Sequence, residues 1–196
     1  MMLKIGITGG IGSGKSTICH FFRLLGAPIF EADLEAKKIM NQSPVIRSNM
    51  QMLFGKDIYL ANQTIDRKKL AGLIFNSPPL LEKVNSIIHP EVRKYFFEWC
   101  EKQKAPYIVH EAAILFESGF YRMMDQTILV TAPLEERIKR VMARENTNEE
   151  DIRNRISKQW PDEEKMKLAT YILNNNNEEL ILPQLIELDI KFKTHG

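Results

Sequence analysis

A glycine-rich segment near the N-terminus limits the possible folds more than any other part of the sequence. Residues 9–16 read Gly-Gly-Ile-Gly-Ser-Gly-Lys-Ser and fit the pattern G-x-x-x-x-G-K-[ST] in full. They lie between a short apolar run at residues 2–8 and a helical pattern at residues 16–25. Glycines let successive backbone N–H groups turn toward phosphate oxygens, and the helix start adds partial positive charge. A chance match in a chain of this length has a probability below about one per cent. The segment therefore predicts a buried parallel strand, a phosphate-binding loop and a helix.

The motif assigns particular residues to the nucleotide. We expect Lys15 to reach the β- and γ-phosphates of ATP, and the Ser16 hydroxyl to ligate Mg²⁺. The other loop residues that we expect to bind ATP are Gly10, Ile11, Gly12, Ser13, Gly14 and Thr17. ATP and Mg²⁺ are therefore the predicted cofactors.

Strand-like and helical patterns alternate along the rest of the chain. Apolar runs predict further strands at residues 28–32, 107–110, 126–131 and 171–173. Helical patterns fill residues 33–104, with expected breaks at residues 43–44, 55, 77–79 and 89–90. Later helices are predicted at residues 134–144, from 147 to about 159, and at 178–192. The alternation predicts an α/β fold: a three-layer core with a parallel five-stranded sheet, and a helical insertion between the second and third strands.

The composition is that of an ordinary globular protein, with 44% apolar and 27% charged residues among 196. The formal charge of +2 comes from basic and acidic residues mixed along the chain, so no nucleic-acid partner is expected. Cys19 and Cys100 are the only cysteines, and we expect two buried or idle thiols in a reducing compartment. The opening apolar run is too short for a signal core or a membrane span. We therefore expect a cytoplasmic protein without a membrane partner, either a monomer or a weak homo-oligomer.

A phosphate-binding loop alone predicts nucleotide binding and no particular reaction. The N-K-x-D and D-x-x-G patterns of GTPases are absent from the sequence, and the chain is short for larger ATPase machinery. A small-metabolite kinase fits better, and it requires a carboxylate opposite the loop. Asp33 is expected at the end of the second strand, where it could accept the acceptor's proton; from position alone, a helix N-cap is an equal alternative. Glu31 should point to the same side of the strand, and either carboxylate could instead hold a magnesium-bound water.

Arginines in the C-terminal third could neutralise the triphosphate. They are Arg137, Arg140, Arg144, Arg153 and Arg155. The first three share one helix face, and the last two follow on a helix that a Thr147–Glu150 capping box would start. Planar guanidinium groups suit phosphate oxygens, and the two helices could close as a lid. Surface ion pairs with the glutamates at 135, 136, 149 and 150 are the better interpretation for any single arginine, whereas the lid is favoured for the group.

Together these residues resemble the dephospho-CoA kinase family, from about residue 3 to residue 190. The stretch Ile7–Ser16 looks like that family's extended phosphate loop, and Glu31-Ala32-Asp33 is similar to its D-A-D segment. His89-Pro90-Glu91-Val92-Arg93 matches its H-P-x-V-R element, which is specific in combination with the loop. The further matches are Ile65-Asp66-Arg67, Leu70, Phe75, Leu115-Phe116-Glu117, Arg155, Gln159 and Ile172–Asn174.

The resemblance implies an ATP-dependent phosphorylation of the ribose 3′-hydroxyl of dephospho-CoA, the last step of coenzyme A synthesis. It implies that Asp33 is the catalytic base, that Arg140 contacts the ATP phosphates and that Asn175 lies near the adenine. The implied acceptor-binding residues are Asp33, His89, Arg93 and Glu117. The implied build has a nucleotide-binding core of residues 1–32, 106–135 and 160–196, an acceptor-binding insertion of residues 33–105 and a lid of residues 136–159.

The chain departs from the family pattern in three places. Glu31 and Thr170 each stand where the family has an aspartate, and Glu111-Ala112-Ala113-Ile114 replaces an aspartate, an aliphatic residue, a proline and a leucine. Glu111 could still orient magnesium through a water molecule. From the residues alone, His89 would start a helix because Pro90 suits a first helical position, and Arg93 could form only a surface ion pair.

Two other functions fit the sequence less well. A related small kinase acting on a nucleoside monophosphate or a sugar acid is the first, but a nucleotide acceptor would require more arginines in residues 33–104 than the three present. A non-catalytic, nucleotide-dependent binding module is the second. Such a module would be free to lose Lys15, Ser16 and Asp33, all of which are present.

Overall fold

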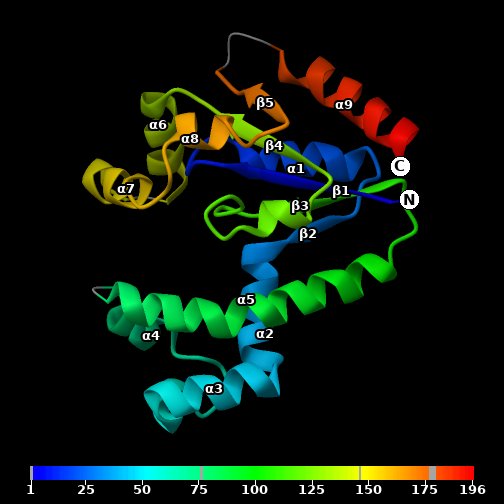
Figure 1. Cartoon of the computed structure of the whole chain (residues 1–196). Coiled ribbons are helices and arrows are strands. Elements are labelled where there is room, and N and C mark those ends of the chain that lie inside the picture. Colours follow the sequence, from blue (N-terminus) through cyan, green and yellow to red (C-terminus); the bar gives the residue numbers. More distant parts are fainter. Residues whose placement is uncertain (1, 76, 146, 177–179) are drawn as a thin grey trace. The chain divides into compact units, whose positions relative to one another are not determined.

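The computed structural model describes residues 2–75, 77–145, 147–176 and 180–196. The chain forms two compact units. Unit 1 consists of residues 1–31 and 103–196, and unit 2 of the intervening residues 32–102. The sheet belongs to unit 1, whereas the named elements of unit 2 are helices (Figure 1).

Unit 1 is built on a five-stranded parallel sheet, which confirms the predicted fold class (Figure 1). The strands are β1 (Leu3–Gly9), β2 (Ile29–Glu31), β3 (Tyr107–Glu111), β4 (Gln126–Thr131) and β5 (Tyr171–Asn174). Their order is β2-β3-β1-β4-β5, so β1 is central. Most residues of β1, β3 and β4 are buried, as expected for a parallel sheet covered on both faces. Ile7 lies opposite Glu111 in the register, so β1 and β3 end at the same edge.

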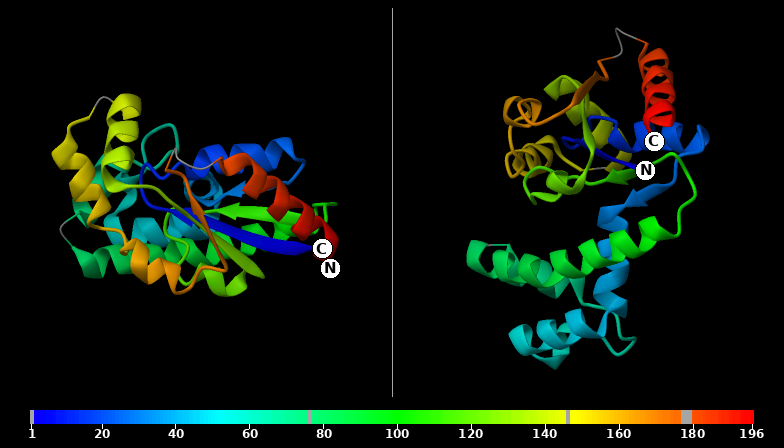
Figure 2. Two further views of the ribbon diagram at one scale, coloured as in Figure 1. Left: turned by 90° about the horizontal axis from the view of Figure 1, so that it is seen from above. Right: turned by 45° about the vertical axis from the view of Figure 1, so that its right-hand side comes forward.

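Helices cover both faces of this sheet. They are α1 (Lys15–Leu24), α6 (Leu134–Glu145), α7 (Glu149–Ile156), α8 (Asp162–Met166) and α9 (Ile181–His195), with a 3₁₀ turn, η2, at Phe120–Met123. α1 and α9 lie side by side on one face (Figure 2), where Phe22 and Leu188 pack against strand residues such as Ile7. His110 alternates with Val109 and so points to the other face, where Phe120 stacks on its ring. The result is a three-layer α/β arrangement.

Unit 2 consists of α2 (Ala32–Gln42), α3 (Pro44–Phe54), the 3₁₀ turn η1 (Lys56–Ile58), α4 (Arg67–Ile74) and α5 (Pro78–Glu101). The hydroxyl of Ser43 accepts the Ile46 amide hydrogen at the start of α3, and the Asp66 carboxylate caps α4 in the same way. The buried apolar residues of the unit include Ile39, Ile46, Met50, Val84 and Phe96.

The predicted helix break at His89-Pro90 is wrong, because α5 runs through both residues. Pro90 has no N–H and leaves the Ser86 carbonyl without its intrahelical donor. Val84, Val92 and Phe96 are nevertheless buried on both sides of the proline. Burial of this continuous apolar face offsets the lost hydrogen bond, so His89 lies inside a helix and does not start one.

The predicted position of Asp33 also requires correction. β2 ends at Glu31 and α2 begins at Ala32, so Asp33 is the second residue of a helix. It is neither the last residue of the strand nor an N-cap, and the expectation that it shares a strand face with Glu31 is wrong. A carboxylate is favourable in the first helical turn, and alanine is a strong helix former, so the helix can start this early.

Two later helices have boundaries that differ from the prediction. The N-cap of α7 is Asn148, which accepts the Asp151 amide hydrogen, so the Thr147–Glu150 capping box is wrong. Asparagine is at least as good a cap as threonine, which explains the choice. This helix ends at Ile156, and residues 162–166 form the separate α8. The closing helix begins at Ile181; residues 178 and 179 of the predicted helix lie outside the described residues.

Two further expectations concern the chain as a whole. Cys19 and Cys100 are both buried thiols, as predicted. Within the described residues, no helix is both long and apolar enough to cross a membrane.

Candidate active site

The glycine-rich segment forms a tight loop between β1 and α1. Gly12 and Gly14 have φ angles of 80° and 93°, which residues with a side chain rarely adopt. Gly14 occupies the N-cap of α1, and among the described residues no side chain caps this helix. The first amide groups of a helix have no intrahelical acceptor, so those of α1 remain for an outside anion. The geometry is that of a phosphate-binding loop.

Lys15, Ser16 and Glu111 meet at the end of the sheet. The Lys15 ammonium donates to Oε1 of Glu111 at 2.9 Å, and the Ser16 hydroxyl donates to the same oxygen at 3.1 Å. Glu111 is the last residue of β3, whereas Lys15 and Ser16 begin α1. The side chains of Lys15 and Glu111 are only 14% and 15% exposed. A cation, a hydroxyl and a carboxylate are therefore fixed together beside the loop, and the two oxygen groups are the kind that magnesium prefers.

Glu31, the other carboxylate considered for magnesium, has a different partner. It lies at the end of β2 and pairs with Arg23 of α1 at 2.5 Å. Its register neighbour in the sheet is Glu111. The contacts thus place Glu111, and not Glu31, against Lys15 and Ser16.

Arg137, one of the three arginines predicted to share a helix face, does not lie on the surface. It is buried, its Nε donates to the Ile11 carbonyl at 2.9 Å, and its Nη1 pairs with Asp162 at 3.1 Å. The Ile11 amide in turn donates to Oε1 of Gln159 at 3.0 Å. Sequence reasoning missed this role, because arginine spacing on one helix does not show which loop lies against it.

Arg140 and Asn175 meet at the other half of the loop. The Asn175 side-chain amide donates to the Ser13 carbonyl at 2.8 Å, and Arg140 donates to the Asn175 carbonyl at 2.9 Å. Beside them is a hollow of about 310 Å³ at the ends of β4 and β5. It is lined by Thr131, Ala132, Pro133, Asn174 and Asn176. The two predicted ATP residues are therefore brought next to the phosphate loop.

The remaining arginines of the group form ion pairs on the surface. Arg153 pairs with Glu135 at 2.9 Å and with Glu149 at 2.7 Å. Arg144 and Arg155 share Glu145. Arg153 therefore follows the ion-pair alternative with two of the glutamates named for it, whereas Arg144 and Arg155 pair with Glu145, which that alternative did not include.

Glu117 is held in a buried ion pair that the sequence did not indicate. Its Oε1 lies 3.1 Å from the Nζ of Lys165 and accepts a hydrogen bond from the Trp160 amide at 3.2 Å. Lys165 is fully buried, whereas Lys167, two residues on, is exposed. No local pattern distinguishes the two lysines; only the packing of α8 against β4 buries one of them.

In unit 2, the predicted acceptor residues lie on two helices. Asp33 is exposed in the first turn of α2. His89 and Arg93 are one helical turn apart on α5 and share a face. Burial, together with the positive charge of Arg93, lowers the pKa of His89. Their neighbour Glu91 accepts a hydrogen bond from Ser43 at 2.8 Å.

The departures from the family pattern at Thr170 and Ala113 also have structural partners. Thr170 exchanges hydrogen bonds with Thr127 through its amide at 3.0 Å and its hydroxyl at 3.1 Å. The Ala113 carbonyl accepts the Gln159 side-chain amide at 3.3 Å and the Thr8 hydroxyl at 3.4 Å.

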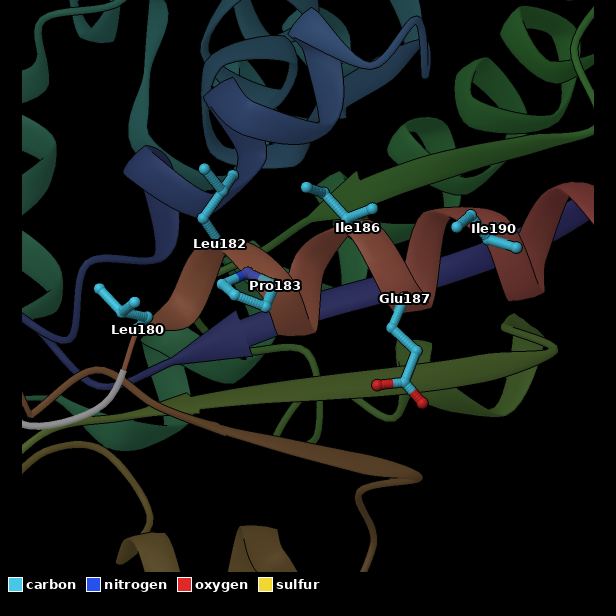
Figure 3. A pocket seen from close by; sticks show the side chains of 6 residues that line it. All are labelled: Leu180, Leu182, Pro183, Ile186, Glu187 and Ile190. Atoms are coloured by element: carbon cyan, nitrogen blue, oxygen red, sulfur yellow. The ribbon is translucent and has the colours of Figure 1, made fainter.

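A larger hollow, of about 520 Å³, lies along α9 (Figure 3). Figure 3 shows Leu182 and Ile186 on the same side of the helix, with Glu187 pointing the other way. None of the predicted ATP-binding residues lines it. Its surface is almost entirely apolar, so it offers no groups for a triphosphate.

Comparisons with known proteins agree with this geometry. Residues 3–180 match the family model described as dephospho-CoA kinase. The chain is 40% identical to a dephospho-CoA kinase of Bacteroides fragilis, over 96% of this chain and 92% of that protein. A crystal structure from Thermus thermophilus is 35% identical, with a TM-score of 0.87 over 97% of both chains. A dephospho-CoA kinase from Campylobacter jejuni is 26% identical, with a TM-score of 0.72 over 99% of this chain and 98% of the other.

Proposed function

The chain belongs to the dephospho-CoA kinase family, and from this we propose that it transfers the γ-phosphoryl group of ATP to the ribose 3′-hydroxyl of dephospho-CoA. The products are coenzyme A and ADP, and the reaction completes coenzyme A synthesis. The observation that carries the proposal is the family match over nearly the whole chain, combined with a phosphate loop whose Lys15 and Ser16 are in place.

On the nucleotide side, the amides at the start of α1 would bind the phosphates, and Lys15 would reach the β- and γ-phosphates. Ser16 and Glu111 would hold Mg²⁺, Glu111 through a water molecule. The Ser16 hydroxyl and the Glu111 carboxylate are hydrogen-bonded to each other beside Lys15. They therefore supply two oxygen ligands at the same place, which supports this assignment. A bound magnesium ion would neutralise charge on the phosphate oxygens. Arg140 would contact the phosphates, and Asn175 would lie near the adenine, next to the hollow at Thr131.

On the acceptor side, we assign the general-base role to Asp33. Its carboxylate would accept the proton of the 3′-hydroxyl as the phosphoryl group transfers. His89 and Arg93 would bind the acceptor from their common face of α5. Glu117 would contribute to acceptor binding by holding the segment that contains Trp160 and Lys165.

We propose the same three parts that the sequence predicted: a nucleotide-binding core, an acceptor-binding insertion and a lid. Residues 33–105 would bind the acceptor, and residues 136–159 would close over the nucleotide as a lid. We also propose a cytoplasmic location, which two buried cysteine thiols support, and a monomer or weak homo-oligomer.

An ADP-release assay with a panel of acceptors tests the function. Dephospho-CoA should be phosphorylated in the presence of Mg²⁺, whereas a nucleoside monophosphate and a sugar acid should not. Phosphorus NMR of the product should place the new phosphate on the ribose 3′ position. Lys15→Ala should abolish transfer and keep the fold by circular dichroism. Turnover with a different acceptor alone, or ATP hydrolysis that no acceptor stimulates, would refute the proposal.

A further inference from the structure

Ile11, the third residue of the phosphate loop, is held on three sides by the segment that follows β4. Its amide donates to Gln159, and its carbonyl accepts from Arg137. Its side chain packs against the small apolar cluster of α6 and α7, which consists of Ile138, Val141 and Ile152. Both peptide groups that flank this residue are therefore fixed from outside the loop.

The two residues that hold Ile11 are themselves fixed. Arg137 is only 6% exposed, and its second hydrogen bond goes to Asp162 at the start of α8. Gln159 uses its side-chain oxygen for Ile11 and its side-chain nitrogen for the Ala113 carbonyl at 3.3 Å. Each of the two side chains thus makes hydrogen bonds to two different protein groups, one of which is the backbone of Ile11.

Gly10 and Gly12 show independently how closely Arg137 approaches the loop. A Cβ atom added to Gly10 would overlap the Arg137 guanidinium group, and one added to Gly12 would overlap the backbone of Arg137. Gly12 also requires glycine because of its φ angle of 80°. The φ angle of Gly10 is not in the left-handed region, so contact with Arg137 is what leaves no room for a side chain there.

A loop with this many glycines loses much conformational freedom when it adopts a single shape. Contacts that fix the loop before the nucleotide arrives remove part of that cost from binding. We infer that Arg137 and Gln159 are positioning residues, which hold Ile11 so that the amides of Gly12 and of Gly14 to Ser16 are arranged for the ATP phosphates. This inference rests on the proposed function, because it takes ATP as the ligand of the loop.

Arg137→Met and Gln159→Leu remove the two hydrogen bonds and keep most of the side-chain volume. The readouts are the affinity for MgATP, measured by calorimetry without acceptor, and the KM values for both substrates. Each variant should weaken MgATP binding roughly tenfold, which corresponds to the loss of about one hydrogen bond. The KM for dephospho-CoA should not change. Lys139→Met is the matched control, because it removes a cation from the exposed face of the same helix, and it should bind MgATP like the wild type.

Gly10→Ala provides a second test that leaves the buried arginine in the chain. Its Cβ should displace the guanidinium group and weaken MgATP binding, and the loss should be much smaller in an Arg137→Ala background. Wild-type MgATP affinity in both Arg137→Met and Gln159→Leu would overturn the inference, as would equal losses from Gly10→Ala in the two backgrounds. Because calorimetry needs no acceptor, these results do not depend on which hydroxyl the protein phosphorylates.

Discussion

The Lys15 ammonium lies 2.9 Å from Oε1 of Glu111, although the two residues are 96 positions apart in the chain. Lys15 begins α1 and Glu111 ends β3, and the parallel register of β1 and β3 brings these two ends together. A lysine that must reach phosphates is thereby kept in one position by a carboxylate. The same carboxylate also orients the Ser16 hydroxyl, so a change at Glu111 should affect both groups.

Glu111→Gln should reduce turnover and the apparent affinity for Mg²⁺ by roughly 10- to 100-fold, as is typical when a residue supporting a metal site is altered. Glutamine can still accept the two hydrogen bonds but has no charge. A magnesium titration of the rate at saturating ATP measures this effect. Glu31→Gln is the control, because Glu31 pairs with Arg23 and should leave the magnesium dependence unchanged. A larger shift in the Glu31 variant would reassign the metal role.

Asp33→Asn should lower the rate of transfer by roughly 10²–10⁴, the usual effect of losing a general base, while MgATP binding is retained. The carboxylate lies in the first turn of α2, where its removal should also cost about 0.3–1 kcal/mol of stability. Glu35→Gln removes a carboxylate from the same turn and controls for that effect. Single-turnover rates and thermal melts of both variants separate the two contributions. Equal rates in the two variants would show that Asp33 only stabilises the helix.

Lys165→Met should lower the free energy of unfolding by about 3–5 kcal/mol, because the Glu117 carboxylate would remain buried without its counter-charge. For a chain of this size the melting temperature should fall by about 6–20 °C. The double variant Lys165→Met/Glu117→Gln should recover much of this loss. Lys167→Met, at an exposed position paired with Glu164, should change stability by less than about 0.5 kcal/mol. Equal melting temperatures for the two lysine variants would contradict the assignment of a stabilising ion pair.

The proposed acceptor role of Glu117 is tested by the single variant Glu117→Gln. If this residue acts on the acceptor side, the KM for dephospho-CoA should rise more than the KM for ATP. A variant that is only less stable, with both KM values unchanged at a temperature where it is folded, would assign Glu117 to the ion pair alone.

His110 should make the protein less stable in acid. Burial lowers the pKa of this imidazole to about 3, whereas in the unfolded chain it takes up a proton below about pH 6.5. Between these two pKa values the unfolded chain binds more protons, so stability falls as the pH decreases. Between pH 7.5 and 5.0 this residue should contribute a loss of about 2 kcal/mol.

The replacement His110→Phe isolates this contribution. Phenylalanine can keep the stacking with Phe30 and Phe120 but does not titrate, so the variant should lose less stability between the two pH values than the wild type. Urea unfolding at pH 7.5 and 5.0 measures the difference. His20→Phe, at an exposed position on α1, should behave like the wild type. An identical pH dependence in His110→Phe and the wild type would exclude the buried imidazole as the cause.

Features defined by short-range spacing were predictable. The strand, loop and helix around Lys15 follow from about twenty consecutive residues, and the five apolar runs all became strands. Errors arose where the local pattern competed with packing or with a better neighbouring residue. Pro90 indicated a helix break, but burial of Val84, Val92 and Phe96 carried α5 through it. Thr147 fitted a capping pattern, but its neighbour Asn148 took the cap.

The sequence was sufficient to identify the phosphate loop, the parallel sheet and the resemblance to one kinase family, because each of these depends on the order and spacing of residues along the chain. The long-range partners required the folded chain. Whether Glu31 or Glu111 faces Lys15, why Arg137 is buried against Ile11, and which lysine pairs with Glu117 all depend on strand register and helix packing. These contacts join residues tens of positions apart, and no local pattern records which side chains the folded backbone will bring within hydrogen-bonding distance.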